Sequence, residues 1–281
     1  MKKIIIFCIL ISKFLLSCKE YDHKLIKIQQ DDCSCIQEQA FSNKSGETVS
    51  VEMRNGRNLL YEVIDSNYVL EGDILLSKEQ IDFLRKVDDE MFNSRSNSSA
   101  PGALLRRWTN STVNFKISIS HRRADILWAI NHIESNTNIN FIENSSGNYI
   151  DFIPSDGCSS QLGMQGGRQT INLSSGCVRG SIVHEICHAL GIFHEQSRPD
   201  RNNNIIINWG NIESDRSHNF ETELAHNYGT FDFGSIMMYN SFAFSSNGNP
   251  TITRLNGATY ATQRNGLSKR HKCSQRYLSW A

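Results

Sequence analysis

Hydrophobic side chains recur at two different spacings along this chain, and these spacings predict a mixture of strands and helices. Residues 113–117 alternate apolar and polar side chains, as a strand with one buried face does. In residues 124–135 apolar side chains return every three or four positions, which predicts an amphipathic helix. Shorter apolar runs predict further strands at 139–142, 149–153 and 170–173. We therefore expect an α+β fold.

A weaker pattern precedes this region and ends in a polar stretch. Ile81, Leu84 and Val87 recur at helical spacing and predict a helix over residues 78–91. Residues 93–102 then read Asn-Ser-Arg-Ser-Asn-Ser-Ser-Ala-Pro-Gly, which is typical of an exposed segment that proteases cut. We expect a small N-terminal part to end here. A plain interdomain linker is the alternative.

The first 18 residues predict export from the cytosol. A basic start is followed by an apolar stretch that is too short, and too interrupted by Lys13, to span a bilayer. Residues 15–18 read Leu-Leu-Ser-Cys and resemble a bacterial lipobox, which predicts that Cys18 carries lipid. A plain cleaved signal peptide is the alternative. We expect an outer-membrane or cell-surface lipoprotein, or a protein secreted after processing, with the lipid as its one membrane contact.

Charge balance argues against one class of partner. Lys and Arg together number 29, and Asp and Glu together also number 29, so the formal net charge is zero. No excess of charge is present to hold a polyanion, and we expect no nucleic-acid partner. The 281 residues suffice for one sizeable domain and a smaller one. We expect a monomer.

The strongest chemical signal is a run that begins at His184 and reads His-Glu-Ile-Cys-His-Ala-Leu-Gly-Ile-Phe-His. On a helix, His184 and His188 project from one face, so both imidazoles can bind one ion. Gly191 can adopt a left-handed conformation that ends the helix and brings His194 back as a third ligand. Three ligands leave zinc an open position, where Glu185 can act on water. An ordinary helix with hydrogen-bonded core histidines is the alternative.

Two further motifs accompany this run. Residues 235–239 read Ser-Ile-Met-Met-Tyr and predict a turn beneath the metal, with Met237 as its soft floor; an apolar core segment is the alternative. Residues 194–201 fit the pattern H-E-x-x-R-x-D-R. With these motifs the chain resembles the astacin family of zinc metalloendopeptidases, which are metzincins, from about Trp108 to Leu267. Asn202 departs from the family, which usually has a second Asp there.

The resemblance implies a fold and a division of the chain. The fold is a metzincin, zincin-like catalytic domain whose two subdomains flank an active-site cleft, preceded by a small propeptide. Residues 1–18 would be the signal peptide, residues 19–98 the propeptide with its activation linker, and residues 99–281 the astacin-like peptidase domain. It also implies an endopeptidase that is made as a zymogen, is cut by an activating protease, and acts on protein or peptide substrates. A non-proteolytic zinc-containing surface lipoprotein is the alternative.

The resemblance also implies a role for each motif residue. One catalytic Zn²⁺ would be held by His184, His188 and His194. Glu185 would move the proton of the attacking water. Tyr239 would be a displaceable zinc contact that stabilises the transition state. The resemblance gives Glu195 the task of receiving the buried amino terminus of the matured enzyme.

A regulatory residue is implied within the N-terminal part. Residues 70–74 read Leu-Glu-Gly-Asp-Ile and resemble the F-x-G-D-I stretch of astacin propeptides, with Leu70 where the family prefers Phe. Asp73 would then occupy the open zinc position of the zymogen. A simple turn between two short strands is the alternative. A thiolate of Cys33 or Cys35 is another alternative zinc ligand.

Export permits disulfides, and the resemblance implies one between Cys158 and Cys177. Cys187 lies on the predicted metal-binding helix away from the metal face, so we expect a buried free thiol. The family's other disulfide lacks its first cysteine, which should fall near Asn138. We therefore expect Cys273 to have no such partner.

Two regions complete the sequence-based expectations. Between Cys158 and Leu173 we expect an edge strand along which substrate binds in an extended conformation, because backbone pairing tolerates most side chains. The half beyond Gly191 is rich in loop residues and predicts an irregular lower subdomain. Residues 269–275 are basic and lack the apolar face of the amphipathic helix that the family has there.

Overall fold

The computed structural model describes residues 37–53, 56–86, 107–223, 227 and 229–268 of the chain. All of them belong to one compact unit, residues 35–281. The predicted signal peptide, Cys18, Cys33, Cys35, the linker at 93–102, Cys273 and the basic tail lie outside the described residues. No helix within the described part of the chain is long and apolar enough to cross a membrane.

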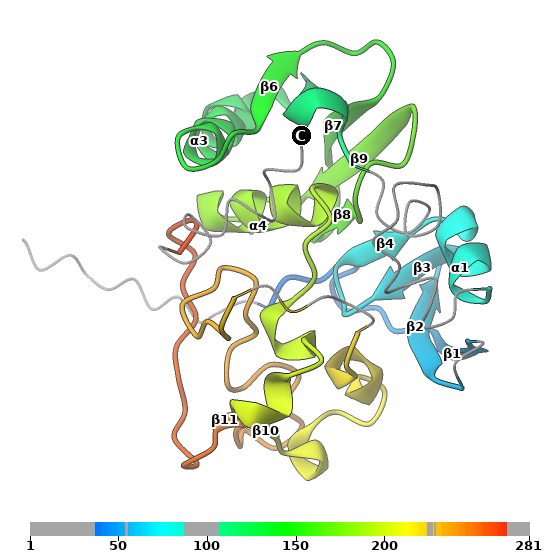
Figure 1. The fold of residues 1–281 in the computed structure, drawn as a ribbon, viewed down its shortest axis with the longest axis vertical. Coiled ribbons are helices and arrows are strands. Elements are labelled where there is room, and N and C mark those ends of the chain that lie inside the picture. Colours follow the sequence, from blue (N-terminus) through cyan, green and yellow to red (C-terminus); the bar gives the residue numbers. More distant parts are fainter. Residues whose placement is uncertain (1–36, 54–55, 87–106, 224–226, 228, 269–281) are drawn as a thin grey trace, which may run out of the picture. The chain divides into compact units, whose positions relative to one another are not determined.

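A mixed sheet of nine strands runs through the described residues, in the order β1-β2-β3-β4-β8-β9-β7-β5-β6 (Figure 1). Neighbours from β1 to β4 pair antiparallel, as do β8 and β9, whereas the remaining pairs, including β4 with β8, are parallel. The strands are β1 (Glu47–Glu52), β2 (Asn58–Ile64), β3 (Asn67–Leu70), β4 (Ile74–Leu76), β5 (Thr112–Ile117), β6 (Asn140–Glu143), β7 (Tyr149–Pro154), β8 (Cys158–Gln161) and β9 (Arg168–Leu173).

Residues 37–86, which we call the N-terminal segment, supply the first four strands and one short helix. The helix α1 (Lys78–Leu84) begins at a capping box, in which Ser77 and Gln80 bond each other's backbone N–H groups. It starts where the sequence predicts but ends at Leu84 instead of continuing to residue 91. The Lys86 N–H bonds the Phe83 carbonyl three residues back, a tight closing turn that ends the helix.

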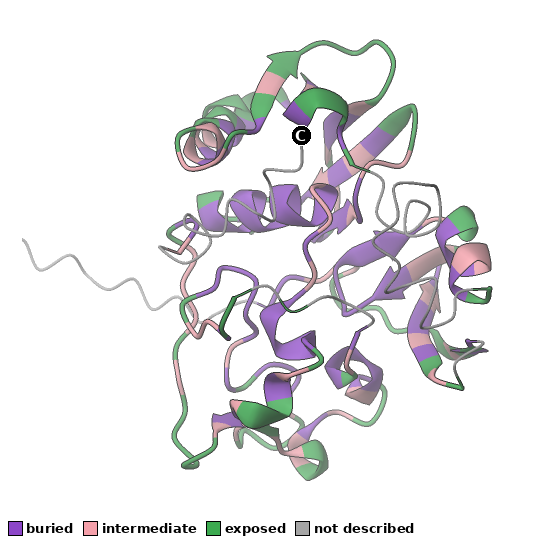
Figure 2. Cartoon of the chain, viewed as in Figure 1, coloured by how far each residue is buried: buried purple, intermediate pink, exposed green. Residues whose placement is uncertain are grey.

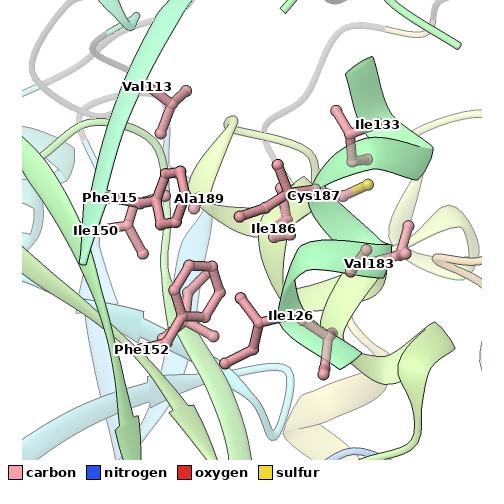
Figure 3. Packing of buried hydrophobic residues seen from close by; sticks show 14 of the residues in the cluster. Val113, Phe115, Ile126, Ile133, Ile150, Phe152, Val183, Ile186, Cys187 and Ala189 are labelled. Atoms are coloured by element: carbon pink, nitrogen blue, oxygen red, sulfur yellow. The ribbon is translucent and has the colours of Figure 1, made fainter. Parts of the chain in front are cut away.

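The predicted strands and helix of the larger domain form with boundaries shifted by two residues or fewer. The helices α3 (Arg123–Glu134) and α4 (Arg179–Ala189) pack on the sheet through one apolar core. Figure 3 shows Phe152 of β7 facing Ile126 of α3 and Ile186 of α4 in this core. Figure 2 shows α4 buried along almost its whole length. The core therefore fixes both the depth and the rotation of the helix that carries the metal motif.

The described cysteines of the larger domain form one disulfide and one free thiol. Cys158, at the start of β8, forms a disulfide with Cys177, two residues before α4. The bond thereby ties β8 to the approach of the metal-binding helix. Cys187 is a free thiol with no exposed surface, and burial raises its pKa to about 12. Such a thiol stays protonated at neutral pH and serves as packing.

Beyond Gly191 the described chain is irregular, as its composition predicts. One two-stranded sheet, β10 (Ile205–Ile207) with β11 (Ile252–Arg254), stands among turns (Figure 1). A separate apolar cluster, which includes Phe220, Tyr239 and Phe244, fills this half. Short 3-10 helices in this half span Glu195–Ser197, Arg201–Asn203, Trp209–Asn211 and Ser217–Phe220. Two others, Thr109–Ser111 and Ser120–Arg122, flank β5 in the preceding half.

A second sequence-based expectation differs from the intact chain. The strand β8, expected as an edge that binds substrate, lies between β9 and β4. The register pairs Ile74 with Ser160 and Leu75 with Gln161, so the N-terminal segment occupies the edge. Pairing between segments this far apart leaves no local pattern in the sequence, which is why the expectation missed it.

Candidate metal centre

Three histidines meet because one helix ends sharply after two of them. His184 and His188 stand one turn apart on the buried face of α4. The N–H of Gly191 then bonds the carbonyl of His188 at 2.8 Å, and Gly191 adopts a φ of 96°. This left-handed residue reverses the chain, as glycine does with least strain. His194 is thereby brought back beside the other two imidazoles.

The imidazoles converge through their Nε2 atoms. The Nε2 atoms of His188 and His194 lie 3.0 and 3.2 Å from Nε2 of His184. Each Nδ1 contacts an outer acceptor, which fixes the ring and leaves Nε2 for the centre. These acceptors are the Ile236 carbonyl for His184, the Ile192 carbonyl for His188 and the Glu71 carboxylate for His194.

Asp73 of the N-terminal segment points into the same centre. Its Oδ2 lies 3.1 Å from Nε2 of His184 and 3.4 Å from Nε2 of His194, and its Oδ1 lies 3.5 Å from Nε2 of His188. Burial alone would raise the pKa of this carboxyl, but the charges of His194 and His188 outweigh it and hold the pKa well below its usual range. The carboxylate is therefore charged where it faces the histidines.

Residues 70–74 also form the simple turn between two short strands that is the alternative interpretation of this motif. Residues 71–73 form a turn that joins β3 to β4. Gly72 has a φ of 83°, and a Cβ there would lie 3.3 Å from the Phe244 ring. The turn and the contact with the histidines are thus one feature, because the tight backbone carries the Asp73 side chain into the centre.

The donor set suits a zinc ion. Asp73, His184, His188 and His194 each offer one ligand atom, and these atoms lie within 4.8 Å of one another. Three imidazole nitrogens and one carboxylate oxygen are the ligand types that zinc takes in tetrahedral sites. All four side chains are buried, and Oδ1 of Asp73 has no hydrogen-bond partner among the described residues. A bound cation would satisfy that buried oxygen.

Glu185 lies beside the centre without an ion-pair partner in the described part of the chain. The side chain is fully buried, and neither carboxylate oxygen has a hydrogen-bond partner there. Burial raises the pKa of Glu185 well above its usual value, and the nearby charges of Asp73 and Glu38 raise it further. A raised pKa brings a carboxyl closer to the range that an acid–base group needs.

The turn at residues 235–239 passes close to His194. The ring of Tyr239 lies 4.7 Å from the His194 ring, and its hydroxyl donates a hydrogen bond to the backbone carbonyl of Glu71. The carbonyl of Met237 accepts from the N–H of Glu195 at 2.8 Å, and the Met237 side chain is buried in the main core. The turn thus supports the chain on the far side of His194.

Comparison with known proteins identifies this arrangement. The family model described as Astacin, a family of peptidases, matches residues 102–277. The chain belongs to the astacin family. The family and the metzincin-type fold predicted from the sequence are confirmed, and the zinc cofactor agrees with the three-histidine centre.

Astacin relatives from animals and bacteria share this part of the chain. Zinc metalloproteinase nas-15 of Caenorhabditis elegans is 41% identical over 179 residues, which cover 59% of this chain and 31% of the relative. Flavastacin of Elizabethkingia meningoseptica is 32% identical over 239 residues, covering 80% and 54%. The hatching enzyme HCE-1 of Oryzias latipes superposes with a TM-score of 0.58 at 31% identity, covering 65% and 98%. The chain spans 31% to 59% of the length of the first curated relatives.

Glu195, the expected partner of an astacin's mature amino terminus, is paired within the intact chain. Its Oε1 accepts from the N–H of Asp232 at 2.8 Å and lies 3.3 Å from Nη1 of Arg198. Burial raises its pKa to about 7, although the charge of Arg198 opposes the shift. This carboxyl is therefore sensitive to any additional cation that reaches it.

Sequence reasoning missed two acidic residues of the N-terminal segment. Glu71 bonds Nδ1 of His194, and its position beside Asp73 in the same motif was the one available signal. Glu38 receives two hydrogen bonds from Arg264, at 2.6 and 2.5 Å, and one from Ser181 at 2.9 Å. Burial tends to raise the pKa of Glu38, but Arg264 lowers it to about 2. No local signal marks Glu38, because Arg264 is 226 residues away.

Proposed function

We propose that this chain is a zinc-dependent endopeptidase that hydrolyses peptide bonds in proteins and is made as a zymogen. The observation that carries the proposal is the Asp73 carboxylate directed at three histidine Nε2 atoms. His184, His188 and His194 would be the permanent zinc ligands. Asp73 would be a fourth ligand that belongs to the N-terminal segment and is lost on activation.

The reaction would use two further residues of the centre. Zinc supplies Lewis acidity, which activates water and polarises the scissile carbonyl. Glu185 would take the proton of the attacking water and return it to the leaving amine, a role that its raised pKa favours. Tyr239 would donate a hydrogen bond to the oxygen that gains negative charge in the transition state. Its hydroxyl must first leave the Glu71 carbonyl.

The N-terminal segment would block the enzyme in two ways. Asp73 would take the position at which water reacts, and β4 would take the backbone groups of β8 that could otherwise pair with a substrate. Cleavage by an activating protease within residues 93–102 would allow the segment to leave, and Met237 would remain as the floor of the centre. Glu195 would then bind the new amino terminus of the 99–281 domain. The propeptide would comprise residues 19–98.

Export of the protein is part of the proposal. Residues 1–18 would direct secretion, and lipid on Cys18 would hold the protein at an outer membrane or cell surface. The disulfide between Cys158 and Cys177 is consistent with an oxidising compartment. Protein or peptide substrates would then be met outside the cytosol.

The test compares the intact chain with the chain cut in the linker. We expect one equivalent of zinc in both, and cleavage of casein by the cut form alone. Glu185→Gln is the matched control, because it should bind zinc and cleave nothing. Asp73→Ala should give the uncut chain measurable activity. Zinc bound at one equivalent without cleavage by the cut form would instead favour a non-proteolytic surface lipoprotein.

A further inference from the structure

Two apolar residues of the larger domain flank the metal-binding histidines. Leu162 directly follows β8, and the N–H of the next residue, Gly163, bonds the carbonyl of His188 at 2.9 Å. Phe193 directly precedes His194. Both residues are therefore tied through the backbone to a histidine of the centre. Neither has a role in the chemistry proposed above.

The N-terminal segment covers both side chains. Leu162 has no exposed surface, and yet it does not belong to the core of its own domain. It lies in a cluster otherwise built from the N-terminal segment, against which Phe193 also packs, half-buried. The segment's members of this cluster are Val51, Met53, Leu59, Tyr61, Leu70, Ile74, Leu76, Ile81 and Leu84. Release of the segment would expose an aliphatic and an aromatic side chain beside the centre.

The strand β4 shows how a chain lies against this surface. It starts immediately after Asp73, whose carbonyl accepts from the N–H of Ser160 at 3.1 Å. Ile74 and Leu76 belong to the cluster that contains Leu162, whereas Leu75 belongs to a separate cluster on the other side. This alternation is that of any strand paired with β8. A chain that pairs here therefore directs every second side chain toward Leu162.

The register on β8 shows how many residues separate the metal centre from the position that faces Leu162. Asp73 faces the histidines one position before the Ile74–Ser160 pair, and Leu162 lies two positions beyond Ser160. A substrate whose scissile carbonyl lies at the metal would thus present a residue two or three positions away to Leu162. Antiparallel pairing is the commoner arrangement. In that orientation the residue facing Leu162 lies on the amino-terminal side of the scissile bond.

We propose that Leu162 and Phe193 form a substrate subsite that selects a large aliphatic side chain two or three residues before the scissile bond. The inference rests on the proposed endopeptidase function and names one element of its specificity. Apolar contact favours leucine or isoleucine there, because a charged side chain would lose hydration against these two apolar residues. The N-terminal segment would fill the same surface with its own aliphatic side chains until activation.

The test measures kcat/KM of the full chain, cut in its linker, on peptides that share one cleavable bond. The residue two or three positions before that bond is varied among Leu, Ile, Ala, Asp and Lys. We expect Leu or Ile to exceed Ala and Asp by about tenfold or more at one of the two positions. Phe193→Ala and Leu162→Ala should each reduce the Leu-to-Ala ratio of kcat/KM severalfold.

The controls separate this subsite from folding and from the function on which it rests. Phe193 is half-buried, so Phe193→Ala provides a reading even if Leu162→Ala impairs folding of the zymogen. Ile142→Ala removes an aliphatic side chain that is 52% exposed on β6 and should leave the Leu-to-Ala ratio unchanged. Equal rates for Leu, Ala and Asp, or ratios unmoved by both variants, would overturn the subsite. Failure to cleave any peptide with zinc bound would overturn the endopeptidase function as well.

Discussion

The Tyr239 hydroxyl is engaged in the intact chain with a backbone group of the N-terminal segment. It donates to the backbone carbonyl of Glu71, and the whole side chain is buried. Burial raises the pKa of Tyr239 well above its usual value, and the charges of Asp73 and Glu71 raise it further. The phenol is therefore a hydrogen-bond donor at every physiological pH. In the proposed activation, removal of the segment would free this donor for the reacting carbonyl.

Tyr239→Phe tests that role at the scale of one atom. The variant keeps the ring that packs against His194 and loses only the hydroxyl. We expect kcat of the cut form to fall by roughly tenfold to a thousandfold with little change in KM, because the proposed hydrogen bond would be made to the transition state. Steady-state kinetics on one peptide measures both constants. An unchanged kcat would remove Tyr239 from the mechanism.

At the scale of elements, the β3–β4 turn determines where Asp73 points. Glu71 and Gly72 both have positive φ, at 50° and 83°. The N–H of Ala40 donates a hydrogen bond to the Gly72 carbonyl at 2.8 Å. This bond ties the turn to the start of the N-terminal segment. A two-residue bend of this kind has little freedom. Small changes in its backbone therefore move the carboxylate relative to the histidines.

Gly72→Ala should loosen this hold while leaving the Asp73 side chain and the three histidines unchanged. A left-handed alanine costs about 1–2 kcal/mol, which corresponds to roughly a five- to thirtyfold larger released population. We expect the uncut variant to show basal peptide cleavage. Gly56→Ala is the matched control, since Gly56 has a φ of 76° in the same segment and no atom of the described residues within 4 Å of its Cβ position. Equal basal activity in the two variants would contradict the specific role of the turn.

At the scale of the whole molecule, a second contact holds the N-terminal segment against the larger domain. It is a buried charge cluster that contains none of the residues of the metal centre. Nη1 of Arg216 lies 3.0 Å from Oε2 of Glu62 on β2, and its Nη2 donates to the Lys44 carbonyl at 2.6 Å. His218 lies beside them, with Nε2 3.8 Å from Glu62 and Nδ1 3.4 Å from the Thr48 hydroxyl. The larger domain thus contributes two basic side chains that the segment covers.

The pKa of His218 predicts that acid weakens this hold. Burial and the charge of the neighbouring Arg216 together lower it to about 4, although Asp215 opposes the shift. Because exposed histidine has a pKa near 6.5, release of the segment is coupled to proton uptake between about pH 6.5 and about pH 4. The association is fully favoured above this window and loses up to about 3 kcal/mol across it. Glu38, with a pKa of about 2, adds a further loss at lower pH.

Size-exclusion chromatography of the cut protein at pH 7.5 and pH 5 measures this coupling. A larger fraction of the segment should remain bound at pH 7.5 than at pH 5. His218→Asn keeps a polar side chain that does not titrate, so we expect a smaller difference between the two pH values. Retention that changes with pH to the same extent in the variant would assign the effect to other groups.

Local spacing predicts much of this molecule, and long-range contacts make up the remainder. His184, His188 and His194 are close in sequence, and one glycine suffices to bring them together. The strands and α3 follow from apolar periodicity within single elements. Glu38 in contrast depends on Ser181 and Arg264, which are 143 and 226 residues away. No periodicity or motif encodes contacts of that kind, so they became visible only in three dimensions.

The shared strand β8 has a consequence for the amount of enzyme activity after cleavage. While the linker is intact, the segment would compete with substrate for β8 at the high effective concentration of a tethered chain. Cutting the linker lowers that concentration to that of the released fragment, without changing any contact. Dilution of the released fragment would then activate the enzyme. A high local concentration of the fragment at a surface would oppose this activation. Activity would depend on where the fragment goes as much as on when the linker is cut.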